Sequence, residues 1–419
     1  MVTILGGVRV VFLIKDLQLS GGVGVIVTHA RNLALDHGFD VTLVTTGSQD
    51  QPSWTYADLP HIHLLPLAEA VNEEFDVAVS TWWETAYSLF SLRAKRYASF
   101  VQSIEDRFYT GHESLDRLGA RLTLDLPVSF ITEASWIAET LAELRPDAPV
   151  HLVRNGIDKE TFAPLAQVTA NNDQPLRVLI EGSSESWFKA IPAALRSVDL
   201  MSEPHRLTLV CPTREGLKPR DAARATGPLT AAELADVYGD TDVLLKLSRV
   251  EGMYGPPLEG FHRGATCVTT EVTGHDEYIR HGVNALIVDW DDERGTAAQL
   301  DLLARDRELL LSLRQGALET AREWPDWSQS SARFSEALRA VAASELPDPY
   351  VHLPDLMRTL SVGLDKERGS RGHYRKVAAD ASRWRKVSSL PGLAQLFAAR
   401  RKLKRLLGRS LGEHGADGG

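Results

Sequence analysis

Residues 242–264, with the sequence DVLLKLSRVEGMYGPPLEGFHRG, carry the clearest structural signal in the chain. They begin with a mainly apolar run of the length of a buried strand, and two glycines follow at positions 252 and 255. Pro256 and Pro257 then suit the first turn of a helix, because the backbone N–H groups there have no helical partner. We therefore predict a strand, a glycine-containing loop and a helix, which is the repeating unit of parallel α/β proteins.

The same alternation of short apolar runs and helical stretches continues on both sides of this segment. Helical spacing of apolar residues recurs between the runs, as in residues 231–238, and no hairpin signal intervenes. Strands that are joined through helices pair in parallel, so we predict doubly wound sheets. The expected strands are residues 9–14, 39–45, 76–80, 98–102, 127–132, 177–181, 206–211, 242–247, 265–270 and 285–288.

The periodicity fails between residues 159 and 175, a stretch that ends in Pro175 and that we interpret as a linker between two domains. The sequence thus predicts an α/β fold of two Rossmann-like domains, at residues 1–165 and 176–325, that face a central cleft. Open parallel sheets bind ligands beyond the carboxyl ends of their strands. We therefore expect the functional site where the two domains meet.

The composition is that of a soluble globular protein, with 24% charged and 43% hydrophobic residues among 419. No apolar run approaches the ~20 residues that a membrane-spanning helix needs. The N-terminal residues lack a basic start and a cleavage site, so we do not expect a secretory signal. Cys211 and Cys267 each lie in an apolar, strand-like run, which argues against a disulfide or a zinc site. We expect a cytoplasmic protein.

The net charge of −10 is unevenly distributed, with −19 in residues 1–350 and +9 in residues 351–419. The acidic body argues against nucleic acid as a partner. In the tail, residues 393–411 place leucines on one helical face among lysines and arginines. Such a helix could make peripheral contact with the inner face of an anionic membrane, dock on the acidic body or stay solvated. The sequence leaves these three alternatives open.

Glu251 and Glu259 stand eight positions apart, on either side of the glycine loop. Backbone N–H groups of such a loop, together with the positive end of the following helix, suit a bound oxyanion. Two carboxylates can accept hydrogen bonds from vicinal hydroxyl groups of a sugar or a ribose. The alternative is a loop glutamate and a helix glutamate that are both solvated, and these residues alone do not decide between the two.

In this setting the Glu-x7-Glu pattern resembles the family 4 (GT4-like) retaining glycosyltransferases, which have the two-Rossmann-domain GT-B fold. Other segments that are similar to those of the family occur in the family's order between residues 6 and 343. They are SGGV at 20–23, RNGID at 154–158, residues 182–189, TGHDEY at 273–278, NAL at 284–286, and residues 323–334. The last resembles a helix that crosses back to the first domain, which we expect at residues 326–344, with the basic tail at 345–419.

The resemblance assigns roles to individual residues. Glu259 would bind the ribose hydroxyls of a nucleoside diphosphate, Glu251 would face the hydroxyls of the donor sugar, and Lys189 would neutralise the diphosphate. Residues 227–229 would lie near the nucleobase. The implied catalytic residues are Glu251, Lys189 and Gln102, and the implied donor-binding residues are Gly21, Gly22, Gly182, Ser183, Lys189, Arg249, Met253, Tyr254, Gly255 and Glu259.

The chain departs from the family pattern in three places, of which residues 262–264 are interpreted as packing and the other two concern the site. Ser183 stands where the family usually has an arginine, and a serine cannot supply a fixed guanidinium charge. Lys246 or Arg249, near the end of the neighbouring strand, could compensate. Gln102 stands where the family often has a histidine near the donor sugar, and His112 is the nearest histidine further along the chain.

Several other signals admit a simpler interpretation. Asp240 and Asp242 have the spacing of a DxD metal motif, but they open a buried strand, so we interpret them as a strand-edge turn and expect no essential metal. Residues 21–24 are not a full dinucleotide fingerprint, which disfavours NAD. Trp82 and Glu105 follow strands on the expected cleft side, where each could contact an acceptor. The alternative is core packing for the tryptophan ring and a solvated carboxylate for Glu105.

We therefore predict a glycosyltransferase that transfers a sugar, with retention of anomeric configuration, from a nucleoside-diphosphate sugar to an unidentified glycan, lipid or small molecule. The nucleotide sugar is its co-substrate, and no further cofactor is expected. A nucleotide-sugar epimerase of GT-B-like fold is one alternative, but the sequence does not locate the catalytic acids and histidine that it would need. A sugar-nucleotide-binding protein with weak catalysis is the other, and the missing phosphate-loop arginine keeps it open.

Overall fold

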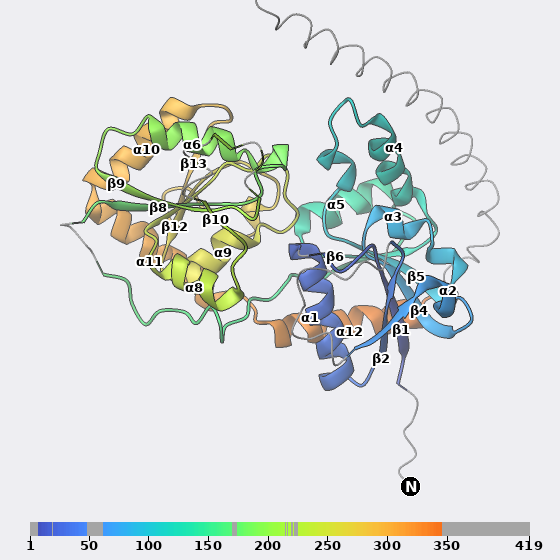
Figure 1. Cartoon of the computed structure of the whole chain (residues 1–419). Coiled ribbons are helices and arrows are strands. Elements are labelled where there is room, and N and C mark those ends of the chain that lie inside the picture. Colours follow the sequence, from blue (N-terminus) through green and yellow to red (C-terminus); the bar gives the residue numbers. More distant parts are fainter. Residues whose placement is uncertain are drawn as a thin grey trace, which may run out of the picture. The chain divides into compact units, whose positions relative to one another are not determined.

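The computed structural model describes residues 7–345, except for residues 19, 48–61, 170–173, 214, 216, 219–220 and 222–224. Within these residues two parallel sheets are flanked by helices (Figure 1). The first sheet contains, in spatial order, β3 (His63–Pro66), β2 (Asp40–Thr45), β1 (Arg9–Ile14), β4 (Glu74–Ser80), β5 (Arg93–Val101), β6 (Ser129–Thr132) and β7 (Val150–Leu152). The second contains β10 (Ala225–Thr226), β9 (His205–Val210), β8 (Leu176–Glu181), β11 (Val243–Lys246), β12 (Thr266–Thr270) and β13 (Ala285–Val288).

Both sheets follow the same path. The chain starts in the middle of the sheet, at β1 or β8, and runs to one edge before it crosses to the other side of that first strand. Thus β1 pairs in parallel with both β2 and β4, and β8 pairs in parallel with both β9 and β11. This order is that of doubly wound Rossmann folds. The prediction of two Rossmann-like domains is confirmed, and we call them the first lobe and the second lobe.

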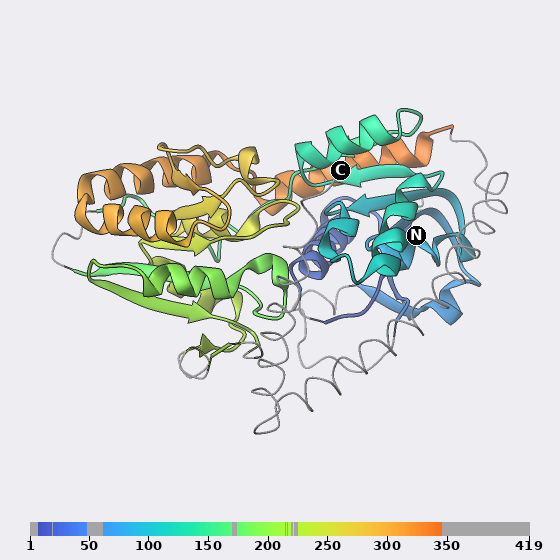
Figure 2. The same ribbon diagram turned by 90° about the horizontal axis from the view of Figure 1, so that it is seen from above.

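Helices connect the strands in both lobes. The first lobe contains α1 (Gly21–Asp36), α2 (Leu67–Ala70), α3 (Trp83–Ala86), α4 (Ser114–Leu122) and α5 (Ser135–Leu144). The second lobe contains α6 (Ile191–Asp199), α8 (Ala231–Gly239), α9 (Gly255–His262), α10 (Glu293–Arg305) and α11 (Arg307–Glu323). Helices α10 and α11, orange in Figure 2, both pack against β12 and β13.

The central strands are buried because helices cover both faces of each sheet. Val10–Ile14 of β1 are at most 1% exposed, and the four residues of β11 are all buried. Strands that are buried on both faces have continuous rather than alternating apolar sequences. That property made β1 and β11 recognisable in the sequence.

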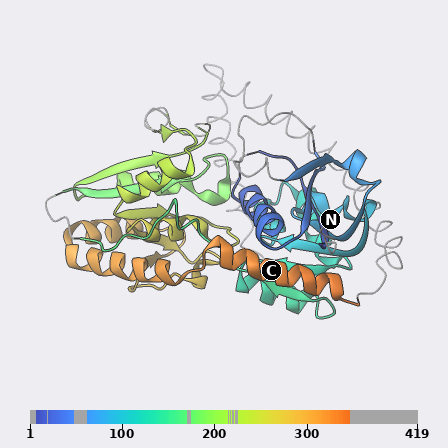
Figure 3. The same cartoon turned by 90° about the horizontal axis from the view of Figure 1, so that it is seen from below.

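The last described helix, α12 (Trp327–Ala343), returns to the first lobe after the chain has completed the second. Asp326 caps its N-terminus by accepting a hydrogen bond from the backbone N–H of Gln329. Phe334 is fully buried, and its ring centroid lies 5.1 Å from that of Phe100 on β5. Helices α1 and α12 lie side by side over this core (Figure 3).

Three edge strands were missed in the sequence, namely β3, β7 and β10. Each has only two to four residues, and β3 and β7 contain half-buried or exposed positions. Strand β5 also starts earlier than expected, at Arg93, because its first residues reach beyond the core and alternate charged with half-buried positions. Short or partly solvated strands lack the long apolar run on which the prediction relied.

Cys211 and Cys267 are both buried free thiols. Among the described residues, no helix combines the length and the apolar character needed to cross a bilayer. Apart from residue 345, the predicted tail at 345–419 lies outside the described residues, and so does its amphipathic segment at 393–411.

Replacing Phe334 by alanine is expected to destabilise the fold by about 3–5 kcal/mol, the usual effect of removing a fully buried phenylalanine. Leu35→Ala on α1 is a suitable control, because that side chain is 53% exposed. The control should change the free energy of unfolding by less than about 1 kcal/mol. Urea unfolding measures both values, and equal stabilities would contradict the packing of α12 in the first lobe.

Candidate functional site

Lys189 and Glu251, two of the predicted catalytic residues, form an ion pair in the second lobe. Lys189 ends the short 3-10 turn Trp187–Lys189, and Glu251 lies in the loop between β11 and α9. The lysine Nζ lies 2.7 Å from Oε1 and 2.9 Å from Oε2 of Glu251. Only 23% of the lysine side chain and 10% of the glutamate side chain are exposed. Because solvent screens this pair only partly, its attraction is stronger than that of a surface ion pair.

The position of Lys189 depends on Gly182, which follows β8 directly. The φ of Gly182 is +143°, a conformation that other residues rarely adopt. A Cβ at this position would lie 3.2 Å from Cδ1 of Ile191 and 3.6 Å from Cβ of Lys189. A glycine therefore lets the loop fold back closely enough for Lys189 to reach Glu251. Ser183, at the position where the resemblance implies arginine, is half-buried next to it.

A second pair of charges lies beside the first. Lys246, the last residue of β11, is 2% exposed and contacts the Oε2 atom of Glu181 at 2.5 Å. Lys246 also donates to the carbonyl oxygen of Glu181 at 3.0 Å. Burial alone would raise the pKa of Glu181, but the charges of Lys246 and Lys189 more than offset it, and this pKa is lowered. Lys246 is therefore committed to Glu181 and does not replace the missing loop arginine in this structure.

Glu259, on α9, is the carboxyl group near these two ion pairs whose negative charge is least neutralised by neighbouring cations. Burial, together with the negative charge of Glu181, raises the pKa of Glu259 to about 7, and Lys246 opposes this shift only in part. Lys189, Glu251, Lys246, Glu181 and Glu259 thus form one cluster of two cations and three carboxyl groups at the carboxyl ends of β8 and β11. The structure brings the three central predicted residues together in this cluster.

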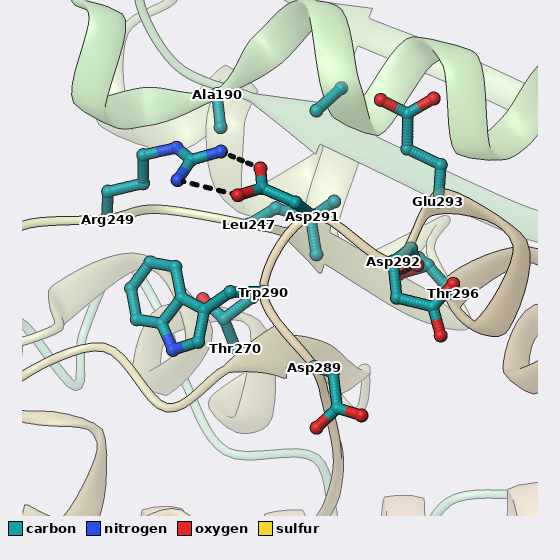
Figure 4. A pocket seen from close by; sticks show the side chains of 11 residues that line it. Ala190, Leu247, Arg249, Thr270, Asp289, Trp290, Asp291, Asp292, Glu293 and Thr296 are labelled. Atoms are coloured by element: carbon teal, nitrogen blue, oxygen red, sulfur yellow. Dashed lines mark hydrogen bonds and ion pairs between the residues drawn. The ribbon is translucent and has the colours of Figure 1, made fainter. Parts of the chain in front are cut away.

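Arg249 points into a different part of the second lobe (Figure 4). Its guanidinium group forms an ion pair with Asp291, and its Cζ atom lies 5.9 Å from the ring centroid of Trp290. These residues line a small pocket together with Leu247, Thr270 and others beyond β11 and β12. In this structure the guanidinium group of Arg249 is thus bound to Asp291 and not to the Lys189–Glu251 pair.

The predicted loop residues contribute mainly through their backbone. The Tyr254 side chain is fully buried, and its hydroxyl donates to the carbonyl oxygen of Lys246 at 2.9 Å. The ring of Tyr254 therefore belongs to the core of the second lobe and is not available to a donor. Gly255 opens α9, so its backbone lies at the positive end of that helix.

The first lobe presents Gln102, Gly21 and Gly22 to the second lobe. Gly21 and Gly22 are the first two residues of α1, and Gln102 follows β5. The Gln102 side chain donates to the carbonyl oxygen of Gly22 at 3.4 Å. On its other side, a Cβ on Gly252 would lie only 1.7 Å from the Gln102 carbonyl oxygen. Only a glycine at position 252 permits this close approach, so Gln102 lies between the glycine segments of both lobes.

Glu133, which is not among the predicted site residues, also contacts the loop between β11 and α9. It follows β6, is 5% exposed, and accepts hydrogen bonds from the Met253 backbone N–H at 3.0 Å and the Asn155 side chain at 2.7 Å. Burial raises the pKa of Glu133 to about 7, although both hydrogen bonds act in the opposite direction. The sequence does contain a feature that points to Glu133, because its carboxyl group directly follows a predicted buried strand. Its partner Met253 is distant in the sequence and could not be inferred.

A further connection between the lobes involves Glu277, within the TGHDEY segment. Its carboxylate accepts hydrogen bonds from the backbone N–H and the hydroxyl of Ser135, and it pairs with Arg154 Nε at 2.7 Å. The Glu277 side chain is fully buried. This glutamate therefore joins the lobes and does not face the charge cluster around Glu251.

The remaining candidates lie outside the cluster. Asp242 forms ion pairs with Arg177 at 2.6 Å and with Arg314 at 3.3 Å, and Asp240 pairs with Arg177 at 3.0 Å. The two aspartates thus hold the start of β11, at the end of the strand that is opposite to Lys246. His112 is exposed in a turn of the first lobe.

Comparison with known proteins finds similarity to glycosyltransferases. Residues 175–306 match the family model described as Glycosyl transferases group 1. The D-inositol 3-phosphate glycosyltransferase of Thermobispora bispora is 28% identical over an alignment of 246 residues, and the match covers 52% of this chain and 57% of that protein. The chain therefore spans little more than half the length of this curated relative. Most of the second lobe is thus similar to the Glycosyl transferases group 1 domain.

Solved structures share the fold of both lobes. Sucrose-phosphate synthase from Thermosynechococcus elongatus has a TM-score of 0.64 at 15% identity, covering 80% of this chain and 100% of that one. HepE from Anabaena, solved in complex with UDP and glucose, has a TM-score of 0.61 at 13% identity and the same coverage of both chains. At these identities the similarity establishes the fold alone, and the fold is that of GT-B glycosyltransferases.

The raised pKa of Glu259 predicts a pH-dependent stability. The folded chain keeps this carboxyl group protonated up to about pH 7, whereas the unfolded chain ionises it near pH 4.3, as usual for glutamate. Stability should therefore fall as the pH rises between these values, by at most about 1.4 kcal/mol per pH unit from this group. Glu259→Gln should flatten this slope in urea unfolding measured from pH 5 to pH 7.

Replacement of the exposed Glu143 on α5 by glutamine controls for the loss of a carboxyl group in general. If Glu259→Gln and Glu143→Gln show the same dependence of stability on pH, the burial of Glu259 among the charges of the cluster is wrong.

Proposed function

We propose that the chain is a retaining glycosyltransferase that transfers a sugar from a nucleoside-diphosphate sugar to an acceptor hydroxyl group. The observation that carries this proposal is the Lys189–Glu251 pair, placed next to the glycine loop that opens α9. A lysine, loop N–H groups and a helix N-terminus together suit a diphosphate. The Glycosyl transferases group 1 match over residues 175–306 supports the same interpretation, and it does not favour an epimerase.

Donor binding would rearrange the ion pair. Without a donor, Lys189 and Glu251 neutralise each other. A diphosphate brings two or more negative charges, so Lys189 would exchange the carboxylate for phosphate oxygens. Glu251 would then be free to accept hydrogen bonds from hydroxyl groups of the donor sugar. Glu259, on the next element, would accept hydrogen bonds from the ribose hydroxyls.

Catalysis would follow from the same charges. As the glycosidic bond breaks, negative charge develops on the diphosphate oxygen that leaves the anomeric carbon. Once Lys189 has moved from Glu251 to the diphosphate, it and the loop N–H groups would stabilise that charge. We propose that the leaving phosphate accepts the proton of the acceptor hydroxyl on the same face of the sugar. This route gives retention and needs no nucleophilic side chain.

The relatives suggest the first substrates to test. HepE was solved in complex with UDP-glucose, so UDP-glucose is the first donor. The curated relative is named for D-inositol 3-phosphate, so this compound is the first acceptor. Release of UDP that depends on an acceptor indicates transfer. Conversion of the donor sugar without an acceptor indicates epimerisation. Binding of UDP-glucose with neither transfer nor conversion indicates a binding protein.

Lys189→Ala should lower the rate of transfer by about 10²–10³-fold, the usual effect of losing one preorganised group that stabilises transition-state charge. Lys95→Ala is the matched control, because this lysine is 76% exposed in the first lobe and pairs only with Asp76 among the described residues. Initial rates of UDP release from UDP-glucose measure both variants. A Lys189→Ala variant as active as the control would refute the assigned role.

Transfer is expected to proceed without an added divalent metal. Lys189 and the N–H groups around Gly255 supply positive charge to the diphosphate, and arginines hold the aspartates of the DxD sequence. Rates should therefore stay within about twofold when excess EDTA is added. A loss of activity that Mg²⁺ or Mn²⁺ restores would show that a metal carries part of this charge.

A further inference from the structure

The first lobe holds the loop of the second lobe at the residues next to Glu251. Glu133 accepts a hydrogen bond from the Met253 backbone N–H at 3.0 Å, two residues beyond Glu251. The indole Nε1 of Trp136 donates to the carbonyl oxygen of Gly252 at 3.0 Å. Consecutive backbone groups of the loop are thus bound by side chains that lie at the β6–α5 turn. The loop that carries Glu251 takes its position from the first lobe as well as from its own.

The fit around this contact is close. A Cβ on Gly252 would lie 2.9 Å from the Glu133 Oε1 atom, in addition to its overlap with Gln102. Gly252 also lies against Gly274, where a Cβ would come within 2.0 Å of the Gly252 carbonyl oxygen. The backbone at position 252 therefore has little space to move while Glu133 remains bound to the loop.

Buried polar side chains support Glu133 from behind. Its second oxygen accepts a hydrogen bond from Asn155, which is 4% exposed in the segment that leads from the first lobe to the second. His29 on α1 is fully buried, and its Nδ1 lies 3.1 Å from the Ser331 hydroxyl on α12. Burial lowers the pKa of His29 to about 3, and the neighbouring Asn155 opposes that shift. Of these buried groups, Asn155 hydrogen-bonds to Glu133, and His29 hydrogen-bonds to Ser331 on α12.

Two donors converge on the two oxygens of Glu133, one a backbone N–H and the other an amide NH2 group. A carboxylate accepts both, whereas a glutamine would offer one acceptor and one donor. Removing the side chain would leave both N–H donors without this buried partner. Hydrogen bonds to charged groups contribute about 1.5–3 kcal/mol each, which corresponds to a factor of roughly 10–150 in an equilibrium.

We propose that Glu133 is a positioning residue that holds the Glu251–Gly255 loop in the conformation that binds the donor diphosphate. The identity of the ligand, a donor diphosphate, rests on the proposed function. The contact between Glu133 and the loop does not depend on that function. Glu133 does not touch the reacting atoms. It acts through the backbone N–H of Met253, and Asn155 holds its other carboxylate oxygen.

The test compares Glu133→Ala and Glu133→Gln with the wild-type chain in two measurements. Hydrogen exchange of the ligand-free full-length protein, followed by mass spectrometry, reports on peptides that cover residues 250–256. Exchange there should become about tenfold faster or more in Glu133→Ala. Glu133→Gln should show a smaller increase, about threefold, because the amide oxygen can still accept the Met253 N–H. Calorimetric titration with UDP should show affinity losses in the same order.

Asp301 provides a matched control. Its carboxylate is 8% exposed and, like that of Glu133, accepts backbone N–H groups, here from Ser202 and Glu203 at 2.9–3.1 Å. Asp301→Ala should accelerate exchange around residues 202–203, while exchange at residues 250–256 and the affinity for UDP remain those of the wild type.

Exchange at residues 250–256 within a factor of two of wild type in both Glu133 variants would overturn the proposal. If Glu133→Ala does not fold, Glu133→Gln alone decides by the same criterion. Faster exchange with unchanged UDP affinity would also overturn it, because the loop would then not need Glu133 to bind the donor. A wild-type chain that binds no UDP would count against UDP as the nucleotide of the proposed function, and the exchange data would still decide whether Glu133 holds the loop.

Discussion

The ion pair between Lys189 and Glu251 is the constraint on which the arrangement of the site depends. Both side chains are largely buried, and a charge removed from water without a partner is destabilising by several kcal/mol. Glu251 therefore needs a cation nearby, and the turn that begins at Gly182 supplies it. The same requirement pairs Lys246 with Glu181. Both ion pairs are thus largely shielded from bulk water. In our proposal, a diphosphate takes the place of the Glu251 carboxylate on Lys189.

Contacts between the lobes extend this constraint. The loop after β11 carries Glu251, but Gln102, Glu133 and Trp136 of the first lobe surround its glycine. Helix α12 adds a covalent return to the first lobe and buries Phe334 in its core. The conformation of the loop after β11 and the contact between the lobes are consequently linked, so a change in one should alter the other.

The sequence predicted the parts of this molecule that rest on local patterns. Continuous apolar runs identified β1 and β11, while β3, β7 and β10 are short edge strands without such a run. Motif resemblance brought out Lys189 and Glu251, which the structure places in contact. Long-range packing could not be anticipated, and it decides that Tyr254 turns into the core and that Arg249 pairs with Asp291. Glu133 was missed for the same reason.

A crystal structure of the full-length chain with bound UDP would show directly whether the Lys189–Glu251 pair opens to bind a diphosphate. We expect Lys189 Nζ to leave Glu251 and contact an oxygen of the diphosphate, with Glu259 within hydrogen-bond distance of the ribose hydroxyls. UDP bound away from the glycine loop that opens α9 would contradict it. So would UDP bound at that loop while Lys189 remains on Glu251 without a phosphate contact.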